Sequence, residues 1–384
     1  MIKNSMVLDF SRFEIPLKVN VMHFLLPLLF SQLIVLHKLI AFPPHYFFIL
    51  FLIPILPTVN KNVIAPFLAI IFFLLMSSWV DNAFREAIQI ALEMAFGYVI
   101  ARFFILQYSH LRLQAFFKRT LYIWAGIVIF YMCDFYFFGG ILNGLSQLIT
   151  DWESGGTSTV FARISILWGN PNWLSFFYLI CFALYVEFNG RSLSVTLLAT
   201  FILFVLQTKT AIALGAFLLL IVVFSKSRRG LNRFAPIFYS IILFGLLFSY
   251  WNDIVKWVED LQNFSSFINR RSIWNFISPT FSWHPNGLMG DGTKMALKAA
   301  SNEDSLPSIF LLLRLFGWPI VLIAFVFLSP FKKNTYLSPT TLVLLGYSLT
   351  QSYLSISASC SLAFFALFLA ISRIKNPRQR YVCN

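Results

Sequence analysis

Apolar runs of about 20 residues recur from one end of this sequence to the other, and about 20 such residues make a helix long enough to cross a membrane. We expect about twelve spanning helices, in a range of about 10 to 13. Their predicted ranges are 19–40, 43–58, 63–80, 86–106, 119–139, 173–188, 193–207, 211–225, 234–251, 306–329, 338–354 and 358–373. The fold class is therefore an all-α polytopic membrane protein, with residues 1–384 forming a single integral membrane domain.

The composition excludes a soluble protein and a disulfide scaffold. Hydrophobic residues make up 59% of the 384 residues and charged residues only 11%, whereas a soluble domain carries about 25% charged residues. Only 4 cysteines are present, too few for a disulfide scaffold. Several of the runs are short for a membrane span. For the pair around Pro43-Pro44 and the pair around Lys209, a re-entrant hairpin is the alternative to two spanning helices.

The net charge of +14 is explained better by membrane orientation than by nucleic-acid binding, because the cations sit between apolar runs. With the N-terminus in the cytoplasm, most of the 29 Lys and Arg residues fall in short cytoplasmic loops. Both termini are therefore predicted to be cytoplasmic. The first apolar run follows a polar segment without a small-residue cleavage site, so we expect an uncleaved signal anchor.

Two predicted outer loops are longer than turns. The medium loop covers residues 140–172, and the large loop covers residues 252–305. Long loops in compact proteins are usually functional or disordered. The large loop also carries several Trp and Phe residues that suit a membrane surface. Any chemistry is therefore expected on the outer side.

Some Lys and Arg residues lie on the predicted outer side or within a predicted span, so membrane orientation does not explain them. The five that we single out as binding residues are Arg163, Lys209, Arg270, Arg271 and Arg314. Arg offers a planar fork for phosphate and Lys a point charge, so several at one membrane face suit a diphosphate. The alternative is that they bind lipid head groups or pair with nearby acids. Arg314 lies inside a predicted span, where an ionisable residue favours function.

Three residues are candidates for catalysis. Glu303 and Asp304 stand where the large loop returns to the membrane, and a carboxylate there can orient or deprotonate an acceptor hydroxyl. Their alternative role is to cap the next helix. His284 is a weaker candidate, since a lone loop histidine is more often structural. Glu93, inside a predicted span, is costly in lipid and must face a partner.

Four short segments follow one another in a recognisable order. They are Arg163 with Gly169-Asn170-Pro171-Asn172, the turn Gln207-Thr208-Lys209-Thr210, the stretch from Arg270 to Trp274, and Asn302 to Asp304 ahead of Gly317-Trp318-Pro319. In this order they resemble the O-antigen polymerase and O-antigen ligase superfamily of bacterial inner-membrane proteins. Lys209 stands where that family has an arginine. The resemblance covers about residues 160–330.

The resemblance implies a glycosyltransferase-C-like membrane fold and an inverting, periplasmic glycosyltransferase that acts on undecaprenyl-diphosphate-linked oligosaccharide. Arg163, Lys209, Arg270 and Arg271 would hold the diphosphate, and Glu303 or Asp304 would orient the acceptor hydroxyl. A chain-length regulator is a partner implied by the resemblance alone. Related metal-dependent transferases carry an acid in the first outer loop, which here reads Ala41-Phe42-Pro43-Pro44-His45. We therefore expect no metal and no other cofactor.

Three functions stay open from the sequence. The ligase branch has a His-Asn pair where this chain has Asn302-Glu303-Asp304, which favours the polymerase unless His284 takes that place. A lipid-linked oligosaccharide flippase is the alternative from another class. A flippase needs cations along a cavity across the membrane, whereas here few charges fall within the predicted spans.

Overall fold

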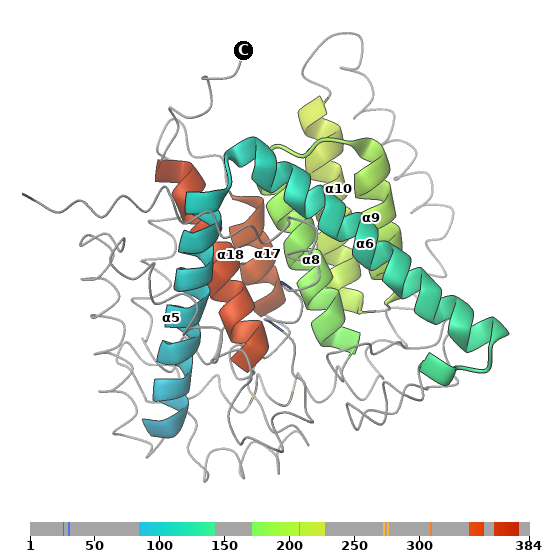
Figure 1. The fold of residues 1–384 in the computed structure, drawn as a ribbon, viewed down its shortest axis with the longest axis horizontal. Coiled ribbons are helices and arrows are strands. Elements are labelled where there is room, and N and C mark those ends of the chain that lie inside the picture. Colours follow the sequence, from blue (N-terminus) through green and yellow to red (C-terminus); the bar gives the residue numbers. More distant parts are fainter. Residues whose placement is uncertain are drawn as a thin grey trace, which may run out of the picture.

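The computed structural model describes residues 26, 30, 84–142, 171–206, 208–226, 272, 275, 308, 338–348 and 357–375. Within these residues all regular structure is helical, as the sequence predicts. The helices are α5 (Phe84–Gln107), α6 (His110–Phe137), α8 (Pro171–Glu187), α9 (Leu193–Val205), α10 (Lys209–Lys226), α17 (Pro339–Ser348) and α18 (Ser357–Lys375). Figure 1 shows their arrangement. The predicted spans 19–40, 43–58, 63–80, 234–251 and 306–329 lie outside the described residues, apart from isolated positions.

Each described helix falls on a predicted span. Five of them, α5, α8, α9, α10 and α18, begin and end within about two residues of the prediction, which is the usual uncertainty of a helix end. The described part of α9 is 13 residues long and that of α17 is 10 residues long. At 1.5 Å per residue α9 reaches only about 20 Å, less than the hydrocarbon thickness of about 30 Å.

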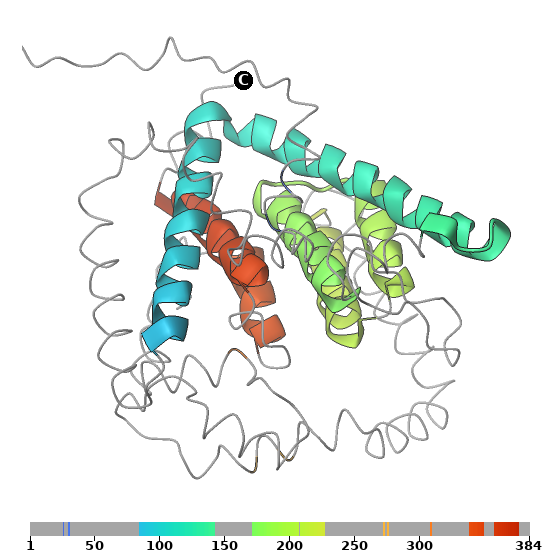
Figure 2. The same ribbon diagram turned by 60° about the horizontal axis from the view of Figure 1, so that its bottom comes forward.

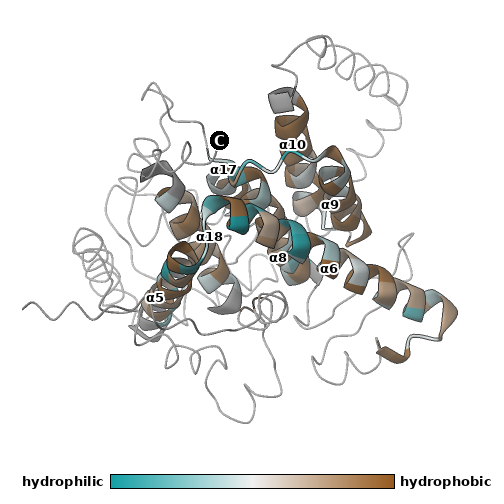
Figure 3. Ribbon diagram, turned by 45° about the horizontal axis from the view of Figure 1, so that its top comes forward, coloured by the Kyte–Doolittle hydropathy of each residue, from teal (hydrophilic) through white to brown (hydrophobic). Residues whose placement is uncertain are grey.

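The start of α6 differs from the prediction. The expected span begins at residue 119, whereas α6 begins at His110 and runs for 28 residues. Ser109 caps this helix by accepting a hydrogen bond from the backbone N–H of Arg112 at 3.4 Å. Arg112, Lys118 and Arg119 are exposed on the first turns of α6, where hydrophilic and hydrophobic residues alternate (Figure 3). A search for apolar runs stops where charged residues begin, and it therefore misses these turns. Lys and Arg are good helix formers, so exposed charges do not end the helix itself.

Two of the described helices are long and apolar enough to cross a membrane, namely Gln89–Gln107 within α5 and His110–Phe137, which is α6. Shorter apolar helices follow at Asn172–Glu187, Leu193–Val205, Thr210–Val223 and Ser359–Ser372. The far end of α6 extends beyond the other described helices (Figure 2). Its last turns expose Phe130, Tyr136 and Phe137, as expected for a helix that faces lipid.

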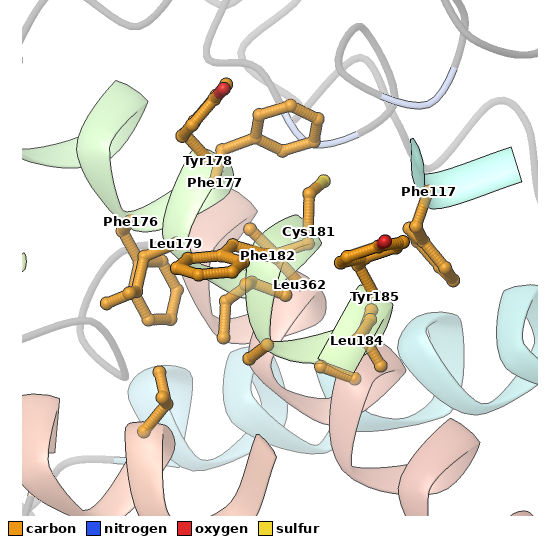
Figure 4. Packing of buried hydrophobic residues seen from close by; sticks show 14 of the residues in the cluster. Phe117, Phe176, Phe177, Tyr178, Leu179, Cys181, Phe182, Leu184, Tyr185 and Leu362 are labelled. Atoms are coloured by element: carbon orange, nitrogen blue, oxygen red, sulfur yellow. The ribbon is translucent and has the colours of Figure 1, made fainter. Parts of the chain in front are cut away.

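Among the described helices α8 is the central one, and apart from Ser175 and the polar residues at its ends it is apolar all round. All residues from Leu174 to Phe188 are buried, and the helix packs against α6, α9, α10, α17 and α18. In Figure 4 its side chains Phe176, Tyr178 and Tyr185 point in different directions around the helix axis. A helix that is hydrophobic all round belongs in the interior of a bundle. Because α8 is central, we name the two ends of the bundle after the two ends of this helix.

Among the helices that the structure describes, α5 and α18 pack against each other most extensively. Tyr98 contacts Phe368 with ring centroids 5.0 Å apart, and Glu93 contacts Ser361 about one to two turns earlier, so the two helices run in the same direction. The side chain of Glu93, which is 1% exposed, accepts a hydrogen bond from the hydroxyl of Ser361. The structure thus supplies a partner for the acid that the sequence predicts to need one.

The two ends of α8 define the two ends of the bundle. At the Glu187 end, Gln114 near the start of α6 donates to the backbone oxygen of Asn189 at 3.3 Å, and Ser338 ahead of α17 donates to Glu187 at 2.6 Å. The predicted topology assigns the segments that precede α6, follow α8 and precede α17 to one side of the membrane. The structure places them at one end of the bundle. We call the opposite end, where α8 begins, the Asn172 end.

The chain leaves α8 through a residue with left-handed backbone geometry. Asn189 has φ 65°, and the amides of Asn189 and Gly190 bond back to Val186 and Tyr185 at 3.0 and 2.8 Å. This is the Schellman pattern of helix termination. A side chain added at Gly190 would collide with the ring of Tyr185, so glycine is required there.

We expect Asn189→Val to lower the free energy of unfolding by about 1–2 kcal/mol, because a β-branched residue is strained at this φ. Asn189→Gly removes the strain and serves as the matched control, with unchanged or slightly higher stability. Thermal unfolding of the purified protein in detergent measures both changes. Equal melting temperatures for the two variants would show that the backbone geometry at this position is unimportant.

Candidate functional site

Among the residues predicted to form the site, Lys209 belongs to the part of the chain that the structure describes, as the first residue of α10. The others lie outside the described residues, and their predicted roles stay predictions. They are Arg163, Arg270, Arg271 and Arg314 for binding, and His284, Glu303 and Asp304 for catalysis. The site is therefore described from the ends of the first two sequence motifs, around Asn172 and around Thr208.

Those two motif segments meet at the Asn172 end of the bundle. The hydroxyl of Thr208 donates to the side-chain oxygen Oδ1 of Asn172 at 3.1 Å, although the residues are 36 positions apart. The hydroxyl oxygens of Thr208 and Ser175 are 2.8 Å apart. Since the Thr208 proton is directed to Asn172, Ser175 is the donor in that second bond. Ser175 is 0% and Thr208 3% exposed, so both hydroxyls are buried and paired.

A third helix joins from a distant part of the sequence. Tyr347 on α17 donates its hydroxyl to the backbone oxygen of Asn172 at 2.9 Å, and its ring packs on Phe176 with centroids 4.6 Å apart. We call Asn172, Ser175, Thr208 and Tyr347 the Asn172 network. Sequence reasoning missed Ser175 and Tyr347. The one available signal was that a tyrosine in an apolar span usually needs a partner for its hydroxyl.

Local sequence explains why two helices begin together here. Proline at the first position of α8 has its backbone angle preset for a helix and lacks an N–H that would go unsatisfied. Thr208 precedes α10, and its carbonyl accepts the bond from Ile212 at 2.9 Å. Both helices therefore direct their first-turn N–H groups towards the Asn172 end. These groups and the helix dipoles favour negative charge, and Lys209 adds a cation to the first turn of α10.

The Glu187 end has a different character. Glu187 is 3% exposed, and its Oε2 accepts hydrogen bonds from the Ser338 hydroxyl at 2.6 Å and the Thr340 amide at 3.3 Å. A carboxylate in this position caps the start of α17 and satisfies its dipole. The acid is thus used for structure, and its negative charge makes the Glu187 end a poor place for an anion.

Within the described ranges, no group of three or more His, Cys, Asp or Glu side chains is arranged to hold a metal ion. Asp134, the buried acid near the end of α6, accepts the backbone N–H of Leu142 at 2.9 Å and so orders the turn that follows the helix. The described residues at the Asn172 end therefore offer hydrogen-bond donors and the positive potential of helix starts.

Comparison of the chain with protein-family models, with curated proteins and with solved structures gives no match. The resemblance described above consequently rests on the order of the motifs in this sequence. The meeting of two of those motifs in space is an independent observation, because hydropathy and motif order do not bring residues 172 and 208 together.

Proposed function

We propose that this chain is an O-antigen polymerase of the bacterial inner membrane. It transfers a growing undecaprenyl-diphosphate-linked glycan onto a new lipid-linked repeat unit at the periplasmic face. The observation that carries the proposal is the hydrogen bond from Thr208 to Asn172, which joins the two motif segments that the resemblance assigns to diphosphate binding. With the N-terminus in the cytoplasm, the Asn172 end is the periplasmic end.

The residues take separate roles in the proposed reaction. Lys209 and the N–H groups at the starts of α8 and α10 bind the diphosphate, together with Arg163, Arg270, Arg271 and Arg314. An acceptor hydroxyl attacks the anomeric carbon from the opposite face, and the bond from that carbon to the phosphate oxygen breaks. The diphosphate leaves with the electron pair, and the surrounding positive charge stabilises it without a metal. Glu303 or Asp304 takes the proton of the hydroxyl, with His284 as the weaker candidate.

The polymerase is favoured over the ligase because Asn302-Glu303-Asp304 lacks the histidine of the ligase branch. A gene deletion separates the polymerase from the other two functions. Loss of the polymerase is expected to leave lipopolysaccharide capped by a single repeat, seen as one band above core on a gel. Bare core in the deletion strain would instead indicate a ligase or a flippase, and unchanged long chains would exclude all three.

Complementation of the deletion strain tests the site itself. Lys209→Met, Arg270→Ala and Arg271→Ala are each expected to abolish long chains while the protein remains in the membrane, because each removes charge from the diphosphate site. Lys118→Met is the matched control, since Lys118 is an exposed lysine on α6 outside the proposed site. Normal chain length in the three site variants would contradict an anion site built from these cations.

A further inference from the structure

The Asn172 network contains two residues to which the proposed reaction assigns no role. Ser175 and Tyr347 carry no charge and are 0% and 2% exposed, so neither is free to contact a substrate in bulk solvent. Both nevertheless bond directly to the segments at the proposed diphosphate site. Their effect on the reaction must therefore pass through Asn172 and Thr208.

The geometry shows how that effect is transmitted. Tyr347 fixes the first turn of α8 to α17 through the backbone oxygen of Asn172, and Thr208 fixes the start of α10 to the same residue. Ser175 donates to Thr208 at 2.8 Å and holds its hydroxyl in the direction of Asn172. Asn172 is half-buried, and the other three members are buried. A network of paired groups that is largely shielded from water is rigid, because an alternative rotamer leaves a polar group without a partner. Lys209 follows Thr208 directly, so the network fixes where α10 presents this residue.

We propose that Tyr347 and Ser175 are positioning residues for the diphosphate site. This inference rests on the proposed function and adds to it the residues that set the site's geometry. The departing diphosphate gains charge in the transition state, so accurately placed cations and N–H groups matter more there than in substrate binding. Loosening the network is expected to lower kcat and to leave KM nearly unchanged.

The test uses the purified full-length protein in lipid nanodiscs, with the lipid-linked repeat unit of its host strain as substrate. Tyr347→Phe keeps the ring against Phe176 and removes only the hydroxyl. Ser175→Ala removes the donor to Thr208. For each variant we expect kcat per folded molecule to fall about tenfold, since small displacements at an active site have effects of this size or larger, and KM to change by less than about twofold.

Tyr178→Phe is the matched control. Tyr178 is also a buried tyrosine of the bundle, and it donates to the backbone oxygen of Leu121 at 3.2 Å, on a neighbouring helix. It lies six residues further along α8 than Asn172, or about 9 Å along the helix. Its loss is expected to lower stability as much as the loss of the Tyr347 hydroxyl while leaving kcat unchanged.

The outcomes separate the two proposals. If the wild-type protein makes no polymer from lipid-linked repeats, the proposed function fails and this inference fails with it. If the wild type is active and Lys209→Met is not, but Tyr347→Phe keeps its kcat or falls no further than Tyr178→Phe, only the positioning role is overturned. Should Tyr347→Phe not fold, Ser175→Ala decides by the same criterion.

Discussion

Gly97→Ala is expected to push α5 and α18 apart and to lower the free energy of unfolding by about 1–3 kcal/mol, the cost of overpacking a tight interface. A Cβ atom at this position would lie 2.6 Å from the backbone oxygen of Ser361 and 2.8 Å from the backbone nitrogen of Phe365. Both are backbone atoms of α18, so no side-chain rotation relieves the contact. Larger residues such as leucine should prevent the two helices from packing at all.

The hydrogen bond between Ser361 and Glu93, close to Gly97, adds to the expected loss of stability. Glu93 lies one turn earlier on α5, and its hydrogen bond from Ser361 requires the same close approach of the helices. Small residues at helix interfaces in membranes allow such approach, and polar pairs then bond across it. Separation of the helices weakens that bond and leaves a buried carboxylate with poorer solvation, which is costly in an apolar interior.

Gly126→Ala is the control, because Gly126 is an exposed residue of α6 and an added Cβ there would meet nothing within 4 Å. Alanine in an open helix position should stabilise by up to about 1 kcal/mol. Thermal unfolding in detergent and the monodispersity of the purified protein measure both variants. Equal stability of Gly97→Ala and Gly126→Ala would show that α5 and α18 are not packed this closely.

Glu187→Ala is expected to cost about 2 kcal/mol, because hydrogen bonds to a charged group are worth about 1.5–3 kcal/mol and the donors become buried without a partner. The carboxylate receives both the Ser338 hydroxyl and the Thr340 amide at the start of α17. The start of α17 should fray first, since the Thr340 amide loses its acceptor and only the Ser338 hydroxyl, which accepts from the Thr341 amide at 3.3 Å, still caps the helix. Hydrogen exchange of the amides at the start of α17, followed by mass spectrometry, would detect this as faster exchange.

Glu187→Gln is the matched variant, since it keeps an acceptor oxygen of the same shape and loses only the charge. We expect it to retain about half of the stabilisation, because a neutral hydrogen bond is about half as strong as a charge-assisted one. If alanine and glutamine are equally destabilising, the charge and not the hydrogen bonds holds α17. If neither changes exchange at the start of α17, Glu187 does not cap that helix.

Hydropathy predicts the described helices well because an apolar run of sufficient length has few other ways to be buried. It fails where polar residues extend a helix, as at the start of α6, where the exposed Arg112 and Lys118 lie on helical turns. Helix ends depend on capping side chains such as Ser109, whose contribution is of the order of 1 kcal/mol. A hydropathy average over about 20 residues does not contain such small local contributions to the free energy.

The candidate site is predictable only in part, for a different reason. The segments containing Asn172 and Thr208 stand out as motifs, but Tyr347 is 175 positions from its partner Asn172, and Ser361 is 268 positions from Glu93. Contacts over such separations depend on how the helices pack. A serine or tyrosine in an apolar run has the same appearance whether it bonds to its own helix or to a remote one.

The capping of α17 by Glu187 has a consequence for how the chain is made. Ser338 follows Glu187 by 151 positions, and ribosomes add about 5–20 residues per second, so the acid precedes its partner by roughly 8 to 30 s during synthesis. The central helix is therefore made and held before the Ser338 and Thr340 donors to Glu187 exist. A chain whose translation stops before residue 338 never completes this contact, and we expect it to be removed faster by proteases that act on incompletely folded chains.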